Sequence, residues 1–151
     1  MLRRRIRISS RAVWLGCLVF LGSAARAENT QDASASQLTI EGDSAVFLQE
    51  QNTIEYVGNV VAFMDGMRIV GDRVLVEMNA DRIERITTNG APATFWQKRH
   101  ATARDTTAAA NTIVFLPDSS LLELSGSASL KQDGNEVSSA LIRYDLTLGQ
   151  L

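Results

Sequence analysis

The feature that most constrains this chain is a strand-rich unit that recurs 68 residues further on. When residues 44–78 are placed on residues 112–146 without a gap, seven of 35 positions are identical, where ordinary residue frequencies give roughly two. The identical pairs are Val46/Val114, Phe47/Phe115, Leu48/Leu116, Glu55/Glu123, Gly58/Gly126, Asp65/Asp133 and Gly66/Gly134. Strand-rich repeats stack because one unit alone cannot bury its apolar face. The sequence therefore predicts a repeating β-scaffold.

Turn residues divide the chain into short segments with alternating polarity. Asp65-Gly66 and Asp133-Gly134 are two-residue hairpin signals, because glycine accepts the positive φ of a type I′ turn. Gly58 and Gly126 stand where one strand passes into the next, as at a bulge or corner. Segments this short and evenly spaced indicate an all-β domain.

The predicted strands cover 38–41, 43–48, 53–57, 59–64, 67–71, 73–78, 83–88, 93–97, 100–104, 109–116, 120–125, 127–132, 135–138 and 140–146. The window 101–110 is rich in alanine, which favours helix, but its threonines oppose a helix. We interpret it as a loop or an edge strand.

Alternation also indicates which side chains face inward. Ile54 and Tyr56 flank Glu55, and Leu122 and Leu124 flank Glu123, so each strand has one apolar and one charged face. The predicted interior contains Ile40, Phe47, Ile54, Tyr56, Val60, Ala62, Ile69, Val74, Val76, Ile86, Phe95, Ile113, Phe115, Leu122, Leu124, Leu130, Ile142 and Tyr144. Composition alone leaves two alternatives open: a filled sandwich core, or a groove that holds an apolar ligand.

The N-terminal residues have the layout of a cleavable secretory signal. A basic segment with five arginines precedes an apolar run from Ala12 to Gly22, and Ala25-Arg26-Ala27 places small residues before a cut after Ala27. An uncleaved membrane anchor is the alternative, but the apolar run is shorter than the ~20 residues that span a bilayer. We predict a signal peptide at 1–27, a polar leader at 28–37 and a single domain at 38–147.

Charge and chemistry exclude several function classes for residues 28–151. That stretch carries 9 basic and 17 acidic residues, which argues against nucleic acid as a partner. It has no cysteine, so a disulfide and a thiolate metal site are excluded. His100 is the only histidine and lies beside Lys98, Arg99 and Arg104. We favour a solvated loop there over a phosphate contact.

No motif for catalysis is present. Asp43 with Asp72, or Glu41 with Glu84, could meet as a carboxylate pair, but roles in turns and solubility are the simpler interpretation. We predict no enzyme, no cofactor and no metal.

Several segments resemble the LptA/OstA-like family of periplasmic lipopolysaccharide-transport proteins. The resemblance rests on the order and spacing of Ile40–Asp43, Ile54–Val61, Met67–Val74, Gly90–Phe95, Leu124–Gly126 and the closing segment 140–146. It covers residues 38 to 146. Two departures lie in the second copy, where Gly126-Ser127 replaces Gly58-Asn59 and Ser139-Ala140 replaces Gly71-Asp72.

Membership would imply a twisted, half-open β-jellyroll of antiparallel strands in the periplasm, with a groove for the acyl chains of lipopolysaccharide. Such domains join head to tail between an inner-membrane LptC-like protein and an outer-membrane LptD-like translocon. The resemblance tips the interior residues toward a groove, made of Ile40, Phe47, Ile54, Tyr56, Val60, Ile69, Val74, Val76, Phe95, Ile113, Phe115, Leu122, Leu124, Leu130, Ile142 and Tyr144. A membrane-anchored relative in the same pathway and a structural β-module with a filled core remain as alternatives.

Cleavage after Ala27 is directly testable. N-terminal sequencing of the protein isolated from its host should begin at Glu28, because small residues stand at the two positions that signal peptidase reads. A sequence that begins at Met1 would favour the anchored relative instead.

Overall fold

The computed structural model describes residues 37–98 and 105–149. These residues belong to the compact unit Ala33–Leu151. The predicted signal peptide and residues 28–36 of the leader lie outside the described residues, as do Arg99, His100 and Arg104. The element order is β1 (Thr39–Glu41), β2 (Ser44–Leu48), η1 (Gln49–Gln51), β3 (Thr53–Met64), β4 (Met67–Asn79), β5 (Arg82–Gln97), β6 (Thr106–Leu116), η2 (Pro117–Ser119), β7 (Leu121–Gln132) and β8 (Asn135–Asp145).

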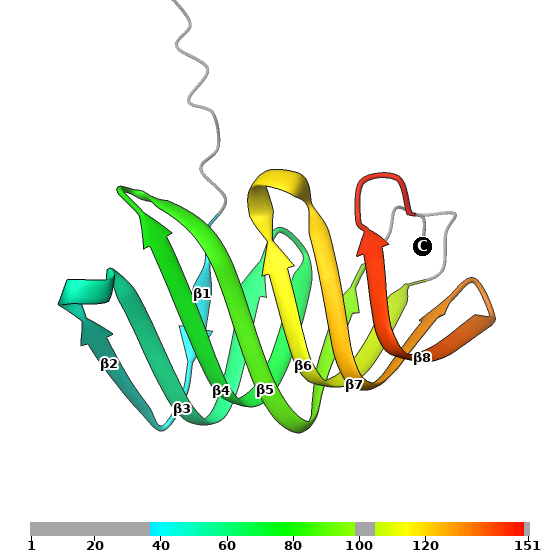
Figure 1. Cartoon of the computed structure of the whole chain (residues 1–151), viewed down its shortest axis with the longest axis horizontal. Helices are drawn as coiled ribbons and strands as arrows, with labels where there is room; N and C mark the ends of the chain where they lie inside the picture. The colour runs from blue at the N-terminus through cyan, green and yellow to red at the C-terminus, as the bar shows by residue number, and fades with distance from the viewer. Residues whose placement is uncertain (1–36, 99–104, 150–151) are drawn as a thin grey trace, which may run out of the picture. The chain divides into compact units, whose positions relative to one another are not determined.

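The strands form one antiparallel sheet in the order β1-β3-β4-β5-β6-β7-β8, with β2 also paired to β3. A register shift interrupts each of the pairings β3–β4, β4–β5, β5–β6, β6–β7 and β7–β8 near the middle of the strands. Figure 1 shows the resulting bends side by side along the lower part of the view. The bends divide the sheet into two arms.

The first arm contains β2 and the strand halves 53–57, 73–79, 82–89, 112–116, 121–125 and 141–145. The second arm contains β1 and the halves 60–64, 67–71, 93–97, 106–109, 128–132 and 135–139. Among the described residues, every ladder pairing joins strand halves of the same arm.

Two bends use consecutive residues with positive φ. Gly58 and Asn59 have φ of 83° and 49°, and Gly126 and Ser127 have 77° and 52°. The extra residues leave the ladder locally and turn the strand without ending it, as β-bulges do. The expectation of many short strands was therefore wrong in its boundaries, because pairs of predicted strands such as 53–57 and 59–64 are halves of one bent strand.

The sequence repeat is also a structural repeat. Both 3-10 turns, η1 and η2, end on a left-handed residue, Asn52 or Ser120. The N–H of Met78 donates to the Asn52 carbonyl at 3.0 Å, and the N–H of Leu146 donates to the Ser120 carbonyl at 2.9 Å. β1 and β2 together occupy the place in the first copy that the single bent strand β6 occupies in the second. β5 lies between the two copies.

The window 101–110 shows where local propensity misleads. Residues 106–110 belong to β6, which lies between β5 and β7 and is not an edge strand. Thr106, Ala108 and Ala110 are buried. Pairing on both sides overrides the weak helical preference of the alanines. Residues 101–104 lie outside the described part of the chain.

The two copies suggest a stability test at Gly71. A Cβ on Gly71 would lie 2.5 Å from Thr88 Cγ2 and 2.6 Å from the Asn89 carbonyl oxygen of β5. The equivalent residue of the second copy is Ser139, on β8, where no described strand takes the place of β5. Gly71→Ala should lower the unfolding free energy by about 2 kcal/mol through overpacking.

The matched control is Ser139→Ala, an exposed position at which a change within about 0.5 kcal/mol is expected. Urea denaturation followed by far-UV circular dichroism measures both. Equal effects of the two substitutions would contradict the assigned contact between β4 and β5.

Phe47 and Phe115 are equivalent in the repeat but differ in exposure, at 55% and 3%. Phe115→Asp should lower the unfolding free energy by more than about 4 kcal/mol, because it places a carboxylate in the core and removes the packing of the ring. Phe47→Asp should leave the urea midpoint nearly unchanged. A midpoint for Phe115→Asp close to that of the unmodified chain would mean that this position is not packed.

Candidate functional site

The predicted groove residues share one face of the sheet. Register places fifteen of the sixteen on three rows that cross the strands, and Val60 lies beside them at the bend opposite Gly71. The first arm carries the rows Phe47-Ile54-Val76-Phe115-Leu122-Tyr144 and Tyr56-Val74-Ile113-Leu124-Ile142. The second arm carries Ile40-Ile69-Phe95-Leu130. We call this surface the inner face.

Along most of its length the inner face is closed. Twelve of the sixteen residues are at most 4% exposed and belong to a single core cluster with members from both arms. They are Val60, Ile69, Val74, Val76, Phe95, Ile113, Phe115, Leu122, Leu124, Leu130, Ile142 and Tyr144. In this conformation these side chains fill the space between the arms as they would in a sandwich core.

The inner face opens at the end formed by β1 and β2. A cavity of about 290 Å³ there is lined by Leu38, Ile40, Ile54, Tyr56, Val76, Met78, Asp81 and Ile83. Phe47 stands opposite Ile54 on the neighbouring strand and is 55% exposed. We call this space the N-terminal cavity. Seven of its eight lining side chains are apolar or aromatic, which suits a hydrocarbon ligand.

Alternation in the sequence missed four of the lining residues. Met78 and Ile83 face the cavity because a register shift follows the Glu77–Arg85 pair, so that Met78 lies opposite Ile83. Ile83 and Ile86 are three residues apart, and a strict period of two assigns them to opposite faces. Leu38 and Asp81 lie just outside their strands, where alternation gives no signal.

The sequence also did not indicate that two threonine hydroxyls would be buried. Thr88 and Thr106 are fully buried, and among the described residues their Oγ1 atoms have no hydrogen-bond partner. Thr88 lies in the row of Val74 and Ile113 on the inner face. A buried hydroxyl without a partner costs about 1–3 kcal/mol, so these two atoms are available to an acceptor group that reaches the interior.

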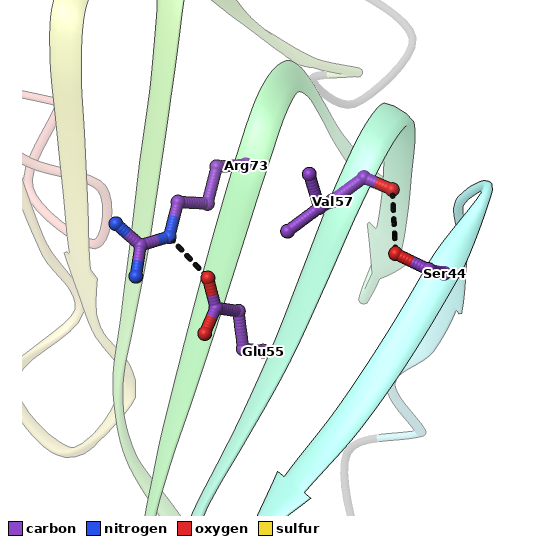
Figure 2. A network of polar contacts seen from close by, with 4 residues as sticks. All are labelled: Ser44, Glu55, Val57 and Arg73. Carbon is purple, nitrogen blue, oxygen red and sulfur yellow. Dashed lines mark hydrogen bonds and ion pairs between the residues drawn. The ribbon is translucent and has the colours of Figure 1, made fainter.

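The outer face of the first arm is polar and wet. Arg73 Nε contacts Glu55 Oε1 at 2.6 Å, and the hydroxyl of Ser44 donates to the Val57 carbonyl at 3.5 Å (Figure 2). Arg143 and Glu123 form a similar pair on β8 and β7 at 2.7 Å. Exposed pairs of this kind contribute at most about 1 kcal/mol. These polar pairs lie on the outer face beside the exposed Val57, whereas the continuous apolar rows and the N-terminal cavity lie on the inner face.

Metal sites, membrane-spanning helices and the predicted basic cluster also bear on what the described residues can do. In 37–98 and 105–149 no three His, Cys, Asp or Glu side chains gather closely enough to hold a metal ion. No helix of the described part is long and apolar enough to cross a membrane. Of the basic cluster around His100, only Lys98 is described. It is exposed, and its N–H donates to the Gly66 carbonyl at 3.3 Å.

Comparison with known proteins now identifies the fold and the family. The profile of a family described as "LptA/(LptD N-terminal domain) LPS transport protein" matches residues 39–150. Among solved structures, the chain is similar to LptH from Pseudomonas aeruginosa, described as the LptA homologous periplasmic component of the lipopolysaccharide transport device, with a TM-score of 0.68 and 26% sequence identity. The match covers 72% of this chain and 76% of LptH. No curated protein sequence matches the chain closely enough to count as a relative.

These findings agree with the open antiparallel sheet and confirm the predicted LptA-like β-jellyroll. Family and fold are those of a transport protein and not of an enzyme, and they support a role in the lipopolysaccharide transport pathway. The chain belongs to the LptA/LptD N-terminal domain family of lipopolysaccharide transport proteins.

Proposed function

We propose that this protein is a periplasmic, non-enzymatic carrier that holds the acyl chains of lipopolysaccharide on its inner face and passes them between the two membranes. The single observation that carries the proposal is the continuity of the apolar inner face with an open cavity at one end. LptH, the similar protein of known structure, is a periplasmic component of lipopolysaccharide transport.

The N-terminal cavity is the natural place for a first contact with the lipid. Its rim presents Phe47, Ile40 and Ile54, which are exposed or half-buried in the free protein. A methylene group that leaves water gains about 0.8 kcal/mol. A short stretch of acyl chain in this cavity therefore gains several kcal/mol without any conformational change.

Deeper loading requires the arms to part. Across the interior, the described residues join the arms through side chains, while the ladder pairings run within each arm. Separation of the arms therefore breaks apolar contacts but no ladder pairing, and an acyl chain replaces those contacts with similar ones. An ester or amide carbonyl near the head group could also accept a hydrogen bond from the Thr88 hydroxyl, which has no partner within residues 37–98 and 105–149.

We propose that copies assemble head to tail through the free edges of the sheet. In the part of the chain that the structure describes, β2 and β8 have a partner strand on one side only, and free edges invite strand addition. Val46 and Val57 near one edge are 54% and 43% exposed, and Leu141 on β8 is 51% exposed. The same edges would receive an inner-membrane LptC-like protein and an outer-membrane LptD-like translocon.

The closed middle of the inner face gives the filled-core alternative specific support. Under that alternative, the twelve packed residues stay packed and no amphiphile binds. A membrane-anchored relative in the same pathway differs from the carrier only in whether residues 1–27 are retained, which N-terminal sequencing decides.

Phe47→Asp should reduce photocrosslinking to lipopolysaccharide several-fold while the fold is kept, because it places a charge at the rim of the N-terminal cavity. Val57→Asp is the matched control, since Val57 is similarly exposed but lies on the outer face. A photoreactive amino acid at Ile83 reports the contact. Equal crosslinking in both variants would place the lipid elsewhere, and no crosslinking in the unmodified chain would favour the filled core.

A further inference from the structure

The residues that follow β8 form a tight turn organised by Asp145. The Asp145 carboxylate accepts the N–H groups of Thr147 and Leu148 through Oδ1, at 2.8 and 2.9 Å. The Asp145 carbonyl accepts the N–H of Gly149 at 2.8 Å, and Gly149 has a φ of 64°. Figure 1 draws this segment in red after the arrowhead of β8. We call Leu146–Gly149 the C-terminal turn.

The C-terminal turn reaches from the first arm to the second. Leu146 packs against the core and donates its N–H to Ser120, on the first arm. Leu148 and Gly149 border a cavity of about 340 Å³ whose other walls include Leu130 and Val137, on the inner face of the second arm. The turn therefore lies across the end of the interior that is opposite the N-terminal cavity.

The repeat shows that this closure is particular to the second copy. Asp145 and the C-terminal turn correspond to Glu77 and residues 78–81, which lead into β5. Glu77 pairs with Arg85 of β5 at 3.7 Å. Its shorter counterpart Asp145 bonds to the backbone of its own turn, as aspartate does in Asx-type turns. Where the first copy continues the sheet, the second copy turns back over the interior.

The apolar side chain that the C-terminal turn presents to this cavity, Leu148, is only partly buried. Leu148 is 65% exposed and Val137 is 37% exposed, although both line the same cavity. A leucine side chain that keeps most of its surface in water gains little free energy of burial. The other end differs, because six of the eight residues that line the N-terminal cavity belong to strands, and Asp81 of the β4–β5 turn stands at its border.

We propose that the C-terminal turn is a displaceable cap, which retains an acyl chain inside the molecule until the acceptor displaces it. The proposal rests on the carrier function above and adds a direction to it. Lipid that has loaded at the N-terminal cavity leaves past Leu148 at the other end.

Transfer of fluorescent lipopolysaccharide from a loaded copy to an excess of empty acceptor tests the cap. The locked variant carries Val137→Cys and Leu148→Cys joined by a short bismaleimide, which is specific because residues 28–151 contain no cysteine. Locking should slow transfer by about tenfold or more while the amount loaded is unchanged. The opened variant, Asp145→Ala, removes both carboxylate hydrogen bonds and should release lipid several-fold faster.

Phe63→Ser is the control, because Phe63 is exposed on the outer face of the second arm, and it should transfer at the unmodified rate. Pull-down of acceptor by the locked variant establishes that docking persists. Transfer by the locked variant at the unmodified rate would overturn the cap.

A second readout separates failure of the cap from failure of the carrier function. If no variant loads lipopolysaccharide, the carrier function is wrong. The fluorescence of anilinonaphthalene sulfonate then tests independently whether the C-terminal turn covers the apolar interior. Asp145→Ala should then bind more of this apolar dye than the unmodified and locked chains. Equal dye binding by all three would overturn the cap as well.

Discussion

The packing of two apolar arms against each other is the interaction on which the rest of this structure depends. Ladder hydrogen bonds hold each arm together, but in the described residues the interior between the arms is bridged by side chains such as Phe95 and Phe115. Apolar packing is non-directional and scales with buried area. The same surface can therefore close on itself in the free protein and accept hydrocarbon of another origin.

This physical equivalence reconciles the filled core with the proposed groove. A rigid open trough would expose a large apolar area to water, which invites aggregation. A trough that closes when empty avoids this exposure. The predicted groove residues that remain accessible, Phe47, Ile40, Ile54 and Tyr56, are those of the end where β1 and β2 leave the inner face uncovered.

The internal repeat explains both the likeness and the difference of the two ends. Positive-φ bends at Gly58 and Gly126 give both copies the same shape. The copies differ at Gly71 and Ser139, because β4 has β5 beside it, whereas no described strand pairs with the corresponding edge of β8. They differ again after Glu77 and Asp145, because the first copy continues into β5 and the second copy turns back over the interior. A duplicated unit has thus acquired two unlike ends.

The sequence predicted the fold class, the repeat, the hairpins and the inner face, because each depends on local turn chemistry or on alternation. It failed where alternation breaks. Ile83 follows a register shift, and residues 106–110 have small side chains whose pairing is decided by their neighbours. Whether the inner face is open or closed depends on the distance between the arms, which no local pattern encodes. The predicted strand 140–146 correctly contains Asp145 but runs one residue past the end of β8, and no local pattern indicates that the Asp145 carboxylate organises the C-terminal turn.

The most direct test of the central claim is methyl NMR of isoleucine-labelled protein during titration with lipopolysaccharide. The account predicts that Ile40, Ile54 and Ile83 of the N-terminal cavity shift first, and that Ile86 and Ile113 deeper on the inner face follow as the arms part. A spectrum that stays unchanged with lipopolysaccharide in excess would contradict the account, as would shifts confined to Ile142 near the far end.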